Sequence, residues 1–391
     1  MYAIVKPKRL SGMVTAPASK SMAHRLLIGA ALSRKPINVK IPDSNDDVNA
    51  TRRCLAHLMT ENSPVLDCGE SGTTLRLLLP LTAVIANGRA TFVGHGRLPD
   101  RPNDELMGVM TSRGASFSSN KLPFTVSGKL HGGKYLLPGN VSSQYISGLL
   151  LALPLLSEDS DIVITTELQS EMYVKMTLDT LDMFGVRWSF DFDGVKPIYH
   201  IFGCQSYTRD ASEDIAVEGD WSSAAFFLAA NALGGGVQVA ELNVNSSQGD
   251  MEAKNLLASM SERVSVKNIP DLFPILAVRA AFLDTDTVFT NIERLRLKES
   301  DRVESVCSLI KSLGGKAVAD EQTVTIRGGG LRGGDVNGFN DHRIVMAAAI
   351  AAAYSTNGAV ISNAECVAKS YPKFWEDFVS LGGGVQLAED T

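Results

Sequence analysis

Six times along the chain, a short polar or glycine-containing segment runs directly into a long apolar stretch rich in Ala and Leu. The polar segments are anchored at Lys20, Gly72, Ser143, Trp221, Asp271 and Asp341. The successive spacings are 52, 71, 78, 50 and 70 residues, so the second half repeats the spacing of the first. A helix that is apolar on nearly all faces must be surrounded by protein. The pattern therefore predicts a duplicated unit with three buried helices in each half.

Short β-type runs closed by Gly, Asn or Asp separate the apolar stretches. These runs are 37–41, 90–94, 124–128, 161–165, 236–242, 287–292 and 323–328. A second class of helix is amphipathic, as in 175–185 and 301–314, and each of these two ends at glycine. Each repeat is therefore expected to combine strands with one exposed and one buried helix, which is an α/β unit.

Composition excludes several classes of function. A net charge of -6 provides no global basic field for nucleic acid, so cations that matter must act locally. No apolar run reaches the ~18 residues of a membrane span, and the N-terminus lacks the apolar core of a secretory signal. The five cysteines show no CxxC spacing and the six histidines no HxxxH. We therefore expect a reduced cytoplasm, no membrane partner and no metal site.

The segment 17–25 (PASKSMAHR) opens the first apolar helix with two cations, Lys20 and Arg25. A helix N-terminus carries about half a positive charge, so a lysine there is unfavourable unless an anion is nearby. The alternative is an ordinary N-cap at Ser19 with a solvated lysine. Because residue 19 is serine and the upstream glycine is missing, the segment is not a Walker A loop, and ATP is not expected.

The segment 68–76 (CGESGTTLR) offers adjacent backbone N–H groups around Gly72, which suit a phosphate or carboxylate. Arg76 lies within the apolar helix that follows, where a buried arginine needs a partner. An internal salt bridge of Arg76 is the alternative. The loop 96–102 (GRLPDRP) holds Arg97 and Arg101, for which a solvated loop is the default interpretation.

Hydroxyl and amide groups precede the third apolar helix at Ser142, Ser143 and Gln144. Helix capping is the simplest role for them. Together with Ser170 and Tyr173 they would instead form a neutral, hydroxyl-rich pocket that suits phosphate and polyol groups.

Charge gathers at helix starts in the second half. Asp271 begins an apolar helix, either as an N-cap or as a base for a substrate hydroxyl. The run 294–302 (RLRLKESDR) is either a surface charge ladder or part of a site. The run 340–343 (NDHR) opens a helix with no further charge through Tyr354, and Lys369 follows in a loop.

The order of these motifs resembles that of a known family. The motifs SKSxxxR, GxSGTxxR, RP, SSQ, SxxY, EGDxSS, PD, KESDR, NDHR and AKSYP follow one another from Pro17 to Phe378. This order is similar to that of the 5-enolpyruvylshikimate-3-phosphate synthases. The resemblance implies a two-domain inside-out α/β barrel with six βαβαββ repeats, three per domain, around buried parallel helices. The domains expected are 13–218, and 1–12 together with 219–391.

The reaction implied by the resemblance joins shikimate 3-phosphate and phosphoenolpyruvate through a tetrahedral adduct and releases phosphate. No cofactor is implied, and a monomer is expected. Domain closure is expected to bring the helix N-termini together around a dry site.

The same resemblance assigns roles to residues. Shikimate 3-phosphate is expected at Ser21, Arg25, Ser142, Ser143, Gln144, Ser170, Tyr173, Asp271 and Lys298. Phosphoenolpyruvate is expected at Lys20, Gly72, Arg101, Gln144, Arg302, Arg343 and Lys369. The catalytic residues expected are Lys20, Asp271, Lys298, Glu299 and His342, with Asp271 and Glu299 as the proton-transfer pair.

Three alternatives differ in function. UDP-N-acetylglucosamine enolpyruvyl transferases carry a reactive cysteine five residues before the arginine that Arg101 matches, and Gly96 stands there. A non-catalytic anion-binding relative would not need an acid/base pair. RNA 3'-phosphate cyclases need a basic face that this chain lacks. Glu70 and Arg294 stand where relatives carry Asn, which leaves substrate affinity and inhibitor sensitivity open.

Overall fold

The computed structural model describes residues 1–85, 89–209 and 214–389, and the chain divides into two compact units. The N-terminal unit is Lys20–Val217, and the C-terminal unit combines Met1–Ser19 with Glu218–Thr391. Residues 13–19 and Glu218, which were expected in the N-terminal domain, therefore lie in the C-terminal unit. Residues 13–19 belong to the C-terminal unit because β2 (Ser11–Thr15) pairs in parallel with β13 (Gly236–Ala240).

Helices and short strands alternate through the N-terminal unit. Its elements are α1 (Lys20–Leu32), β3 (Val39–Lys40), α2 (Asp46–Thr60), β4 (Val65–Asp67), α3 (Gly72–Ile85), β5 (Arg89–Val93), η1 (Leu98–Asp100), α4 (Asp104–Ser112), β6 (Ala115–Phe117), β7 (Phe124–Gly128), β8 (Gly133–Leu137), α5 (Ser143–Ala152), η2 (Leu153–Leu155), β9 (Ser160–Ile164), α6 (Glu171–Met183), β10 (Trp188–Phe192), β11 (Pro197–Ile201) and β12 (Ile215–Ala216). Both amphipathic helices predicted from the sequence are present, as α6 here and α10 in the other unit.

The C-terminal unit has the same alternation. Its elements are β1 (Tyr2–Lys6), β2, α7 (Trp221–Ala232), β13, η3 (Gly249–Glu252), α8 (Ala253–Ala258), β14 (Arg263–Ser265), α9 (Phe273–Ala281), β15 (Thr287–Thr290), η4 (Glu293–Leu297), α10 (Arg302–Ser312), β16 (Lys316–Ala319), β17 (Thr323–Arg327), β18 (Gly334–Val336), α11 (His342–Tyr354), β19 (Ala359–Ser362), η5 (Ala364–Lys369), α12 (Phe374–Ser380) and β20 (Gly384–Ala388).

Sheet topology confirms the α/β repeat. In β4-β5-β7-β6 and β14-β15-β17-β16, the first two strands are parallel and the third and fourth pair antiparallel. The sheet β10-β11-β9-β8 has the same pairing when it is followed from β8, since β8 and β9 are parallel and β9–β11 and β11–β10 are antiparallel. The fourth sheet, β18-β19-β1-β20, is completed by β1 from the start of the chain. The remaining two repeats are reduced to the parallel pairs β12–β3 and β13–β2.

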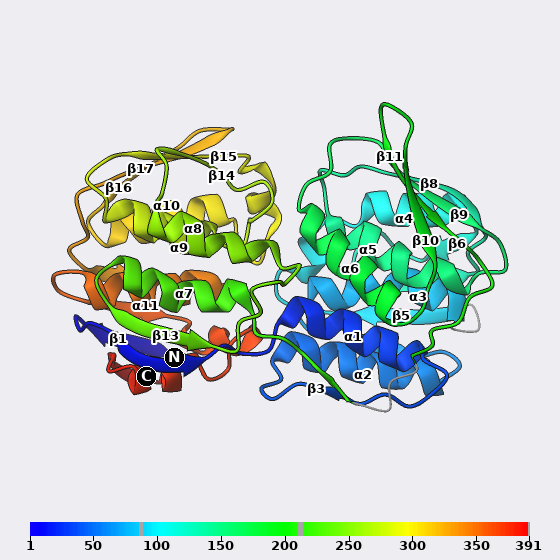
Figure 1. The fold of residues 1–391 in the computed structure, drawn as a ribbon, viewed down its shortest axis with the longest axis horizontal. Helices are drawn as coiled ribbons and strands as arrows, with labels where there is room; N and C mark the ends of the chain where they lie inside the picture. The colour runs from blue at the N-terminus through cyan, green and yellow to red at the C-terminus, as the bar shows by residue number, and fades with distance from the viewer. Residues whose placement is uncertain (86–88, 210–213, 390–391) are drawn as a thin grey trace. The chain divides into compact units, whose positions relative to one another are not determined.

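The six apolar stretches form helices in which most residues are buried, as the sequence predicts: α1, α3, α5, α7, α9 and α11. Gly148 allows α5 to lie close to α3, because a Cβ there would be 2.3 Å from the carbonyl oxygen of Arg76. Within the C-terminal unit, α7, α9 and α11 lie alongside one another, with strands toward the outside (Figure 1).

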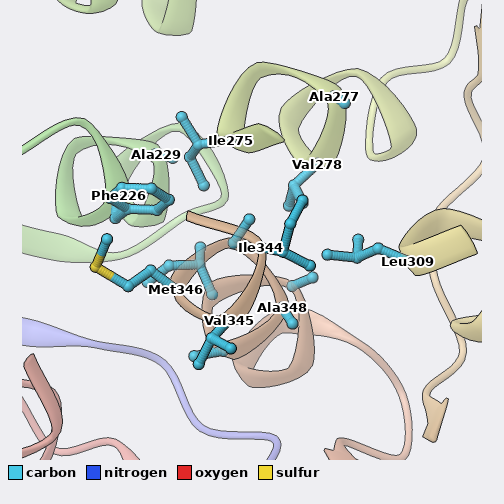
Figure 2. Close-up of a cluster of buried hydrophobic side chains, with 14 of the residues drawn as sticks. Phe226, Ala229, Ile275, Ala277, Val278, Leu309, Ile344, Val345, Met346 and Ala348 are labelled. Carbon is cyan, nitrogen blue, oxygen red and sulfur yellow. The ribbon is translucent and has the colours of Figure 1, made fainter. Parts of the chain in front are cut away.

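Figure 2 shows how the C-terminal core is filled. Phe226 of α7, Val278 of α9 and Leu309 of α10 surround Ile344 and Met346 of α11, and each is at most 1% exposed. Burying one such side chain contributes about 1.5–3 kcal/mol. The packed core holds the starts of these helices, and so the polar residues at those starts, in fixed positions. No helix among the described residues is long and apolar enough to cross a membrane.

Candidate functional site

Arg25 on α1 is an arginine that is 1% exposed and whose guanidinium is held by neutral oxygens. Its Nε donates to Thr177 Oγ1 at 2.7 Å and one Nη to the Ser21 carbonyl at 2.7 Å. The other Nη donates to Ser147 Oγ at 3.2 Å and to the Tyr173 carbonyl at 2.8 Å. Burial lowers the pKa of Arg25 to about 10, so it remains charged at neutral pH. Within the described part of the chain, no carboxylate forms a salt bridge with Arg25, and a buried cation of this kind favours an anionic ligand.

Lys20, the first residue of α1, is 8% exposed and forms a partly buried ion pair. Its Nζ lies 3.0 Å from Oδ2 of Asp47, in the first turn of α2. The alternative of a solvated lysine is wrong, because Lys20 is 8% exposed and paired with Asp47, while the neighbouring Ser19 Oγ donates to Gln248 Oε1 at 3.1 Å. Asp47 supplies the negative charge that a lysine at a helix N-terminus requires.

Gly72 begins α3 and contacts the guanidinium of Arg101, which is 9% exposed. A Cβ at residue 72 would lie 2.6 Å from Nη1 of Arg101. A side chain at residue 72 would displace this guanidinium from its position against the loop. The structure brings together two of the residues expected to bind phosphoenolpyruvate.

Arg76 orients Gln144. Its Nη1 donates to Gln144 Oε1 at 2.9 Å and its Nε to Asn103 Oδ1 at 3.0 Å. Because arginine is only a donor, the amide oxygen of Gln144 must face it. The amide nitrogen then donates to Thr73 Oγ1 at 2.9 Å, beside Gly72.

The expected serines lie at helix starts. Ser142 is the N-cap of α5 and accepts the N–H of Gln144 at 3.3 Å, so its capping role is confirmed. Ser143 is buried in the first turn of α5. Ser170, with φ of 57°, precedes α6, the helix whose Tyr173 carbonyl accepts from Arg25. Arg25 itself is held by Ser147 of α5 and by Tyr173 and Thr177 of α6, so these two helices and α1 meet around its guanidinium.

In the C-terminal unit, the Asp271 carboxylate joins three cations. Its Oδ1 lies 2.7 Å from Nη1 of Arg302, its Oδ2 lies 3.1 Å from Nη2 of Arg343, and Lys298 Nζ is 3.5 Å from Oδ1. Burial opposes ionisation of Asp271, but Arg343, Lys298 and Arg302 outweigh it and hold the pKa well below 3.8. The N-cap interpretation is wrong, because α9 begins at Phe273 and Asp271 lies before its cap residue.

Arg302 is the centre of this cluster and is 1% exposed, which excludes a surface charge ladder. Its Nη2 lies 2.9 Å from Glu299 Oε2 and its Nε 2.9 Å from Asp341 Oδ2. Burial disfavours its charge, but Asp341, Glu299 and Asp271 outweigh burial and raise its pKa. Three carboxylates therefore face the three cations Lys298, Arg302 and Arg343, and the cluster is close to neutral.

The remaining expected residues lie at the edges of the cluster. Burial lowers the pKa of Lys298 to about 8, against the opposing effect of Asp271. His342 is buried as the first residue of α11, next to Asp341. Lys369 Nζ donates to the carbonyl of Asn340 at 2.8 Å, at the start of the NDHR turn.

Sequence reasoning missed several polar partners. Asp47 and Asp341 pair with Lys20 and Arg302, and Ser147, Thr177 and Ser222 accept from Arg25 or Arg343. The available signals were a hydroxyl inside an apolar helix, at Ser147, and an acidic helix start, at Asp341. No group of His, Cys, Asp and Glu able to hold a metal occurs among the described residues.

Solved enolpyruvyl transferases share the fold of this chain. The EPSP synthase from Acinetobacter baumannii has a TM-score of 0.78 at 23% identity, with 99% of each chain covered. The enolpyruvyl transferase NikO from Streptomyces tendae has a TM-score of 0.74 at 16% identity, with 98% of each chain covered. At these identities the likeness establishes the fold alone.

Sequence comparison gives the family. A model of the family described as EPSP synthase (3-phosphoshikimate 1-carboxyvinyltransferase) matches residues 4–378. The 3-phosphoshikimate 1-carboxyvinyltransferase of Clostridium kluyveri is 38% identical, with 98% of each chain covered. That of Clostridium novyi is 36% identical, with 96% of each covered. The chain therefore belongs to the EPSP synthase family.

Proposed function

We propose that the chain transfers the enolpyruvyl group of phosphoenolpyruvate to the 5-hydroxyl of shikimate 3-phosphate and releases phosphate. The observation that carries this proposal is the full-length match to the family and to relatives of that activity at 36–38% identity. Both substrates are anions, which accords with two groups of buried cations in a chain whose net charge is -6.

In this proposal, Arg25 receives the phosphate of shikimate 3-phosphate, with Ser21, Ser142, Ser143, Ser170 and Tyr173 around it. The buried guanidinium without a carboxylate partner among the described residues supports this role. A phosphate would supply the missing counter-charge through charge-assisted hydrogen bonds.

Phosphoenolpyruvate is proposed to bind Lys20, Gly72, Arg101, Gln144, Arg302, Arg343 and Lys369. An anionic substrate would compete with Asp271 for its arginines, which raises the basicity of that carboxylate as the substrate binds. Preorganised cations of this kind stabilise phosphate as it leaves.

Asp271 and Glu299 are proposed to move the protons. In the addition step the 5-hydroxyl loses its proton as its oxygen bonds carbon 2, while the methylene carbon gains a proton. In the elimination step the resulting methyl carbon loses a proton and the carbon–oxygen bond to phosphate breaks. Lys20, Lys298 and His342 are proposed as the further catalytic groups. The separation of Asp271 and Glu299 on either side of Arg302 supports a division of labour between them.

Gly96 supports shikimate 3-phosphate over UDP-N-acetylglucosamine as the acceptor. Its φ is +61°, and a Cβ there would lie 2.5 Å from Oε2 of Glu70. A cysteine at this position would be strained and would clash with Glu70 unless that side chain moved.

We further propose domain closure on the substrates, a monomeric state and a cytoplasmic location. The five free cysteines accord with the cytoplasmic location.

The test is phosphate release from phosphoenolpyruvate, run with shikimate 3-phosphate and separately with UDP-N-acetylglucosamine. We expect release with the first acceptor alone and an enolpyruvyl ether product by mass spectrometry. Release with the second acceptor alone would move the function to the related transferases. A folded protein that binds shikimate 3-phosphate but releases no phosphate with either acceptor would favour the anion-binding alternative.

A further inference from the structure

A chain of buried hydroxyls crosses three helices of the N-terminal unit. His24 Nδ1 on α1 lies 2.7 Å from Thr51 Oγ1 on α2, and Thr51 Oγ1 lies 2.7 Å from Thr74 Oγ1 on α3. His24, Thr51 and Thr74 are each 0% exposed. Because the three side chains are fully buried, these hydrogen bonds take the place of contacts with bulk solvent.

The chain ends on backbone and side-chain groups that border the proposed phosphoenolpyruvate residues. Thr74 Oγ1 lies 3.2 Å from the carbonyl oxygen of Asp47, whose carboxylate holds Lys20. It also lies 2.8 Å from Oγ of Ser71, which caps α3 by accepting the N–H of Thr74 at 3.1 Å. Ser71 immediately precedes Gly72. The hydroxyls therefore connect the partner of Lys20 with the glycine loop.

Counting hydrogens favours one direction for this chain. A carbonyl oxygen only accepts, so a hydrogen bond to Asp47 points the single hydroxyl hydrogen of Thr74 away from Thr51. Donation from Thr74 to Ser71 has the same consequence. In this direction Thr51 donates to Thr74, and Thr51 Oγ1 accepts from His24 with the imidazole proton on Nδ1.

The environment of His24 agrees with a neutral imidazole in this tautomer. Burial, followed by the charges of Lys20 and Arg25, lowers the pKa of His24 well below 6.5. In the described structure Nε2 of His24 is buried and has no hydrogen-bond partner. An unpartnered lone pair on Nε2 is less costly than an unpartnered N–H, which accords with the proton on Nδ1.

We propose that Thr51 and Thr74 are positioning residues for the enolpyruvyl donor, with the Nδ1–H form of His24 as the fixed end of their hydrogen-bond chain. They hold α2, and so Asp47 and Lys20, at a set distance from the Ser71–Gly72 turn. This inference rests on the proposed function for the identity of the donor. The hydroxyls touch no substrate in this account, so they act through Lys20 and the loop.

The kinetic test compares Thr51→Val and Thr74→Val with a matched control, Thr82→Val. Thr82 is on α3 and 1% exposed, and its hydroxyl donates only within its own helix, to the Leu79 carbonyl at 2.7 Å. We expect each of the two valine variants to raise KM for phosphoenolpyruvate about tenfold, the effect of one hydrogen bond. The KM for shikimate 3-phosphate should stay within about twofold, as should all parameters of Thr82→Val. Thr74→Ser, which restores the hydroxyl, should recover the wild-type KM.

A spectroscopic measurement stands independently of turnover and of the variants' folding. In ¹⁵N NMR of the wild-type protein, the His24 ring should show a protonated Nδ1 and an unprotonated Nε2 at neutral pH. A protonated Nε2 would overturn the proposal, as would Thr51→Val and Thr74→Val with the same KM as Thr82→Val. If the wild type releases no phosphate, the proposed function fails. Calorimetric binding of phosphoenolpyruvate by the same variants then replaces KM, and unchanged affinities would overturn the positioning role.

Discussion

Two arginines, each 1% exposed, are held in opposite ways in the two units. Arg25 donates to hydroxyl and carbonyl oxygens, and burial lowers its pKa. Arg302 is ion-paired to Asp271, Glu299 and Asp341, and these carboxylates raise its pKa. Arg25 therefore lacks a counter-charge among the described residues, whereas Arg302 already has three carboxylate partners.

The difference indicates a division of labour. A cation without a counter-ion stores a desolvation cost that a bound phosphate can offset, so Arg25 suits binding. A cation surrounded by carboxylates gains less from a further anion, but it helps to keep Asp271 ionised in a buried place. Asp271 is thus able to accept a proton, and the first three predictions below are ordered by expected size.

The largest effect is expected from Asp271→Asn. An amide cannot take the hydroxyl proton, so kcat should fall by about 10²–10⁴. Steady-state phosphate release measures this. Asp161→Asn is the control. Asp161 lies outside the site, on β9, where its Oδ1 is 2.6 Å from Nδ1 of His200 on the neighbouring strand β11. A kcat within threefold of wild type would remove Asp271 from the chemistry.

Arg302→Met should destabilise the fold by about 3–5 kcal/mol, because Asp271, Glu299 and Asp341 lose their shared partner. Arg25→Met should change the free energy of unfolding by less than about 1.5 kcal/mol. The reason is that Thr177 Oγ1 still donates to Ser147 Oγ, 2.8 Å away, after the guanidinium is removed. Urea denaturation compares the two variants. Equal losses would contradict the distinction between the arginines.

A smaller, pH-dependent effect is expected from Lys298, whose pKa is lowered to about 8 by burial. The side chain is a cation below that pH and neutral above it. If the cation is needed, kcat/KM should fall about tenfold per pH unit above pH 8, and Lys298→Arg should move this limb to higher pH. A pH–rate profile up to pH 10 that is the same for both proteins would assign the limb to another group.

Local sequence signals predicted the helices well. Each apolar stretch is a buried helix, because an all-round apolar surface permits no other environment. The order of motifs also identified Asp271, Lys298 and Arg302 as members of one site, and the structure joins them. What the motifs did not reveal was the neutral surroundings of Arg25, since the acceptors come from separate helices.

Long-range pairing was not predictable in the same way. The domain boundary shifts because β2 pairs with β13, more than 200 residues away, and short parallel strands carry no signal of their partner. Thr51 and Asp47 were overlooked for a related reason. Both are polar residues on the amphipathic helix α2, where a solvated position is the default expectation. Only the tertiary packing shows Thr51 buried and Asp47 half-buried against α1 and α3.

The most direct test of the division between the two arginines is calorimetric titration of shikimate 3-phosphate into the wild type and into Arg25→Met, each first shown to be folded by circular dichroism. If the guanidinium receives the phosphate, the wild type binds the ligand and Arg25→Met binds it at least about a hundredfold more weakly, as expected for a lost buried charge pair. Equal affinity in the two proteins would contradict the account.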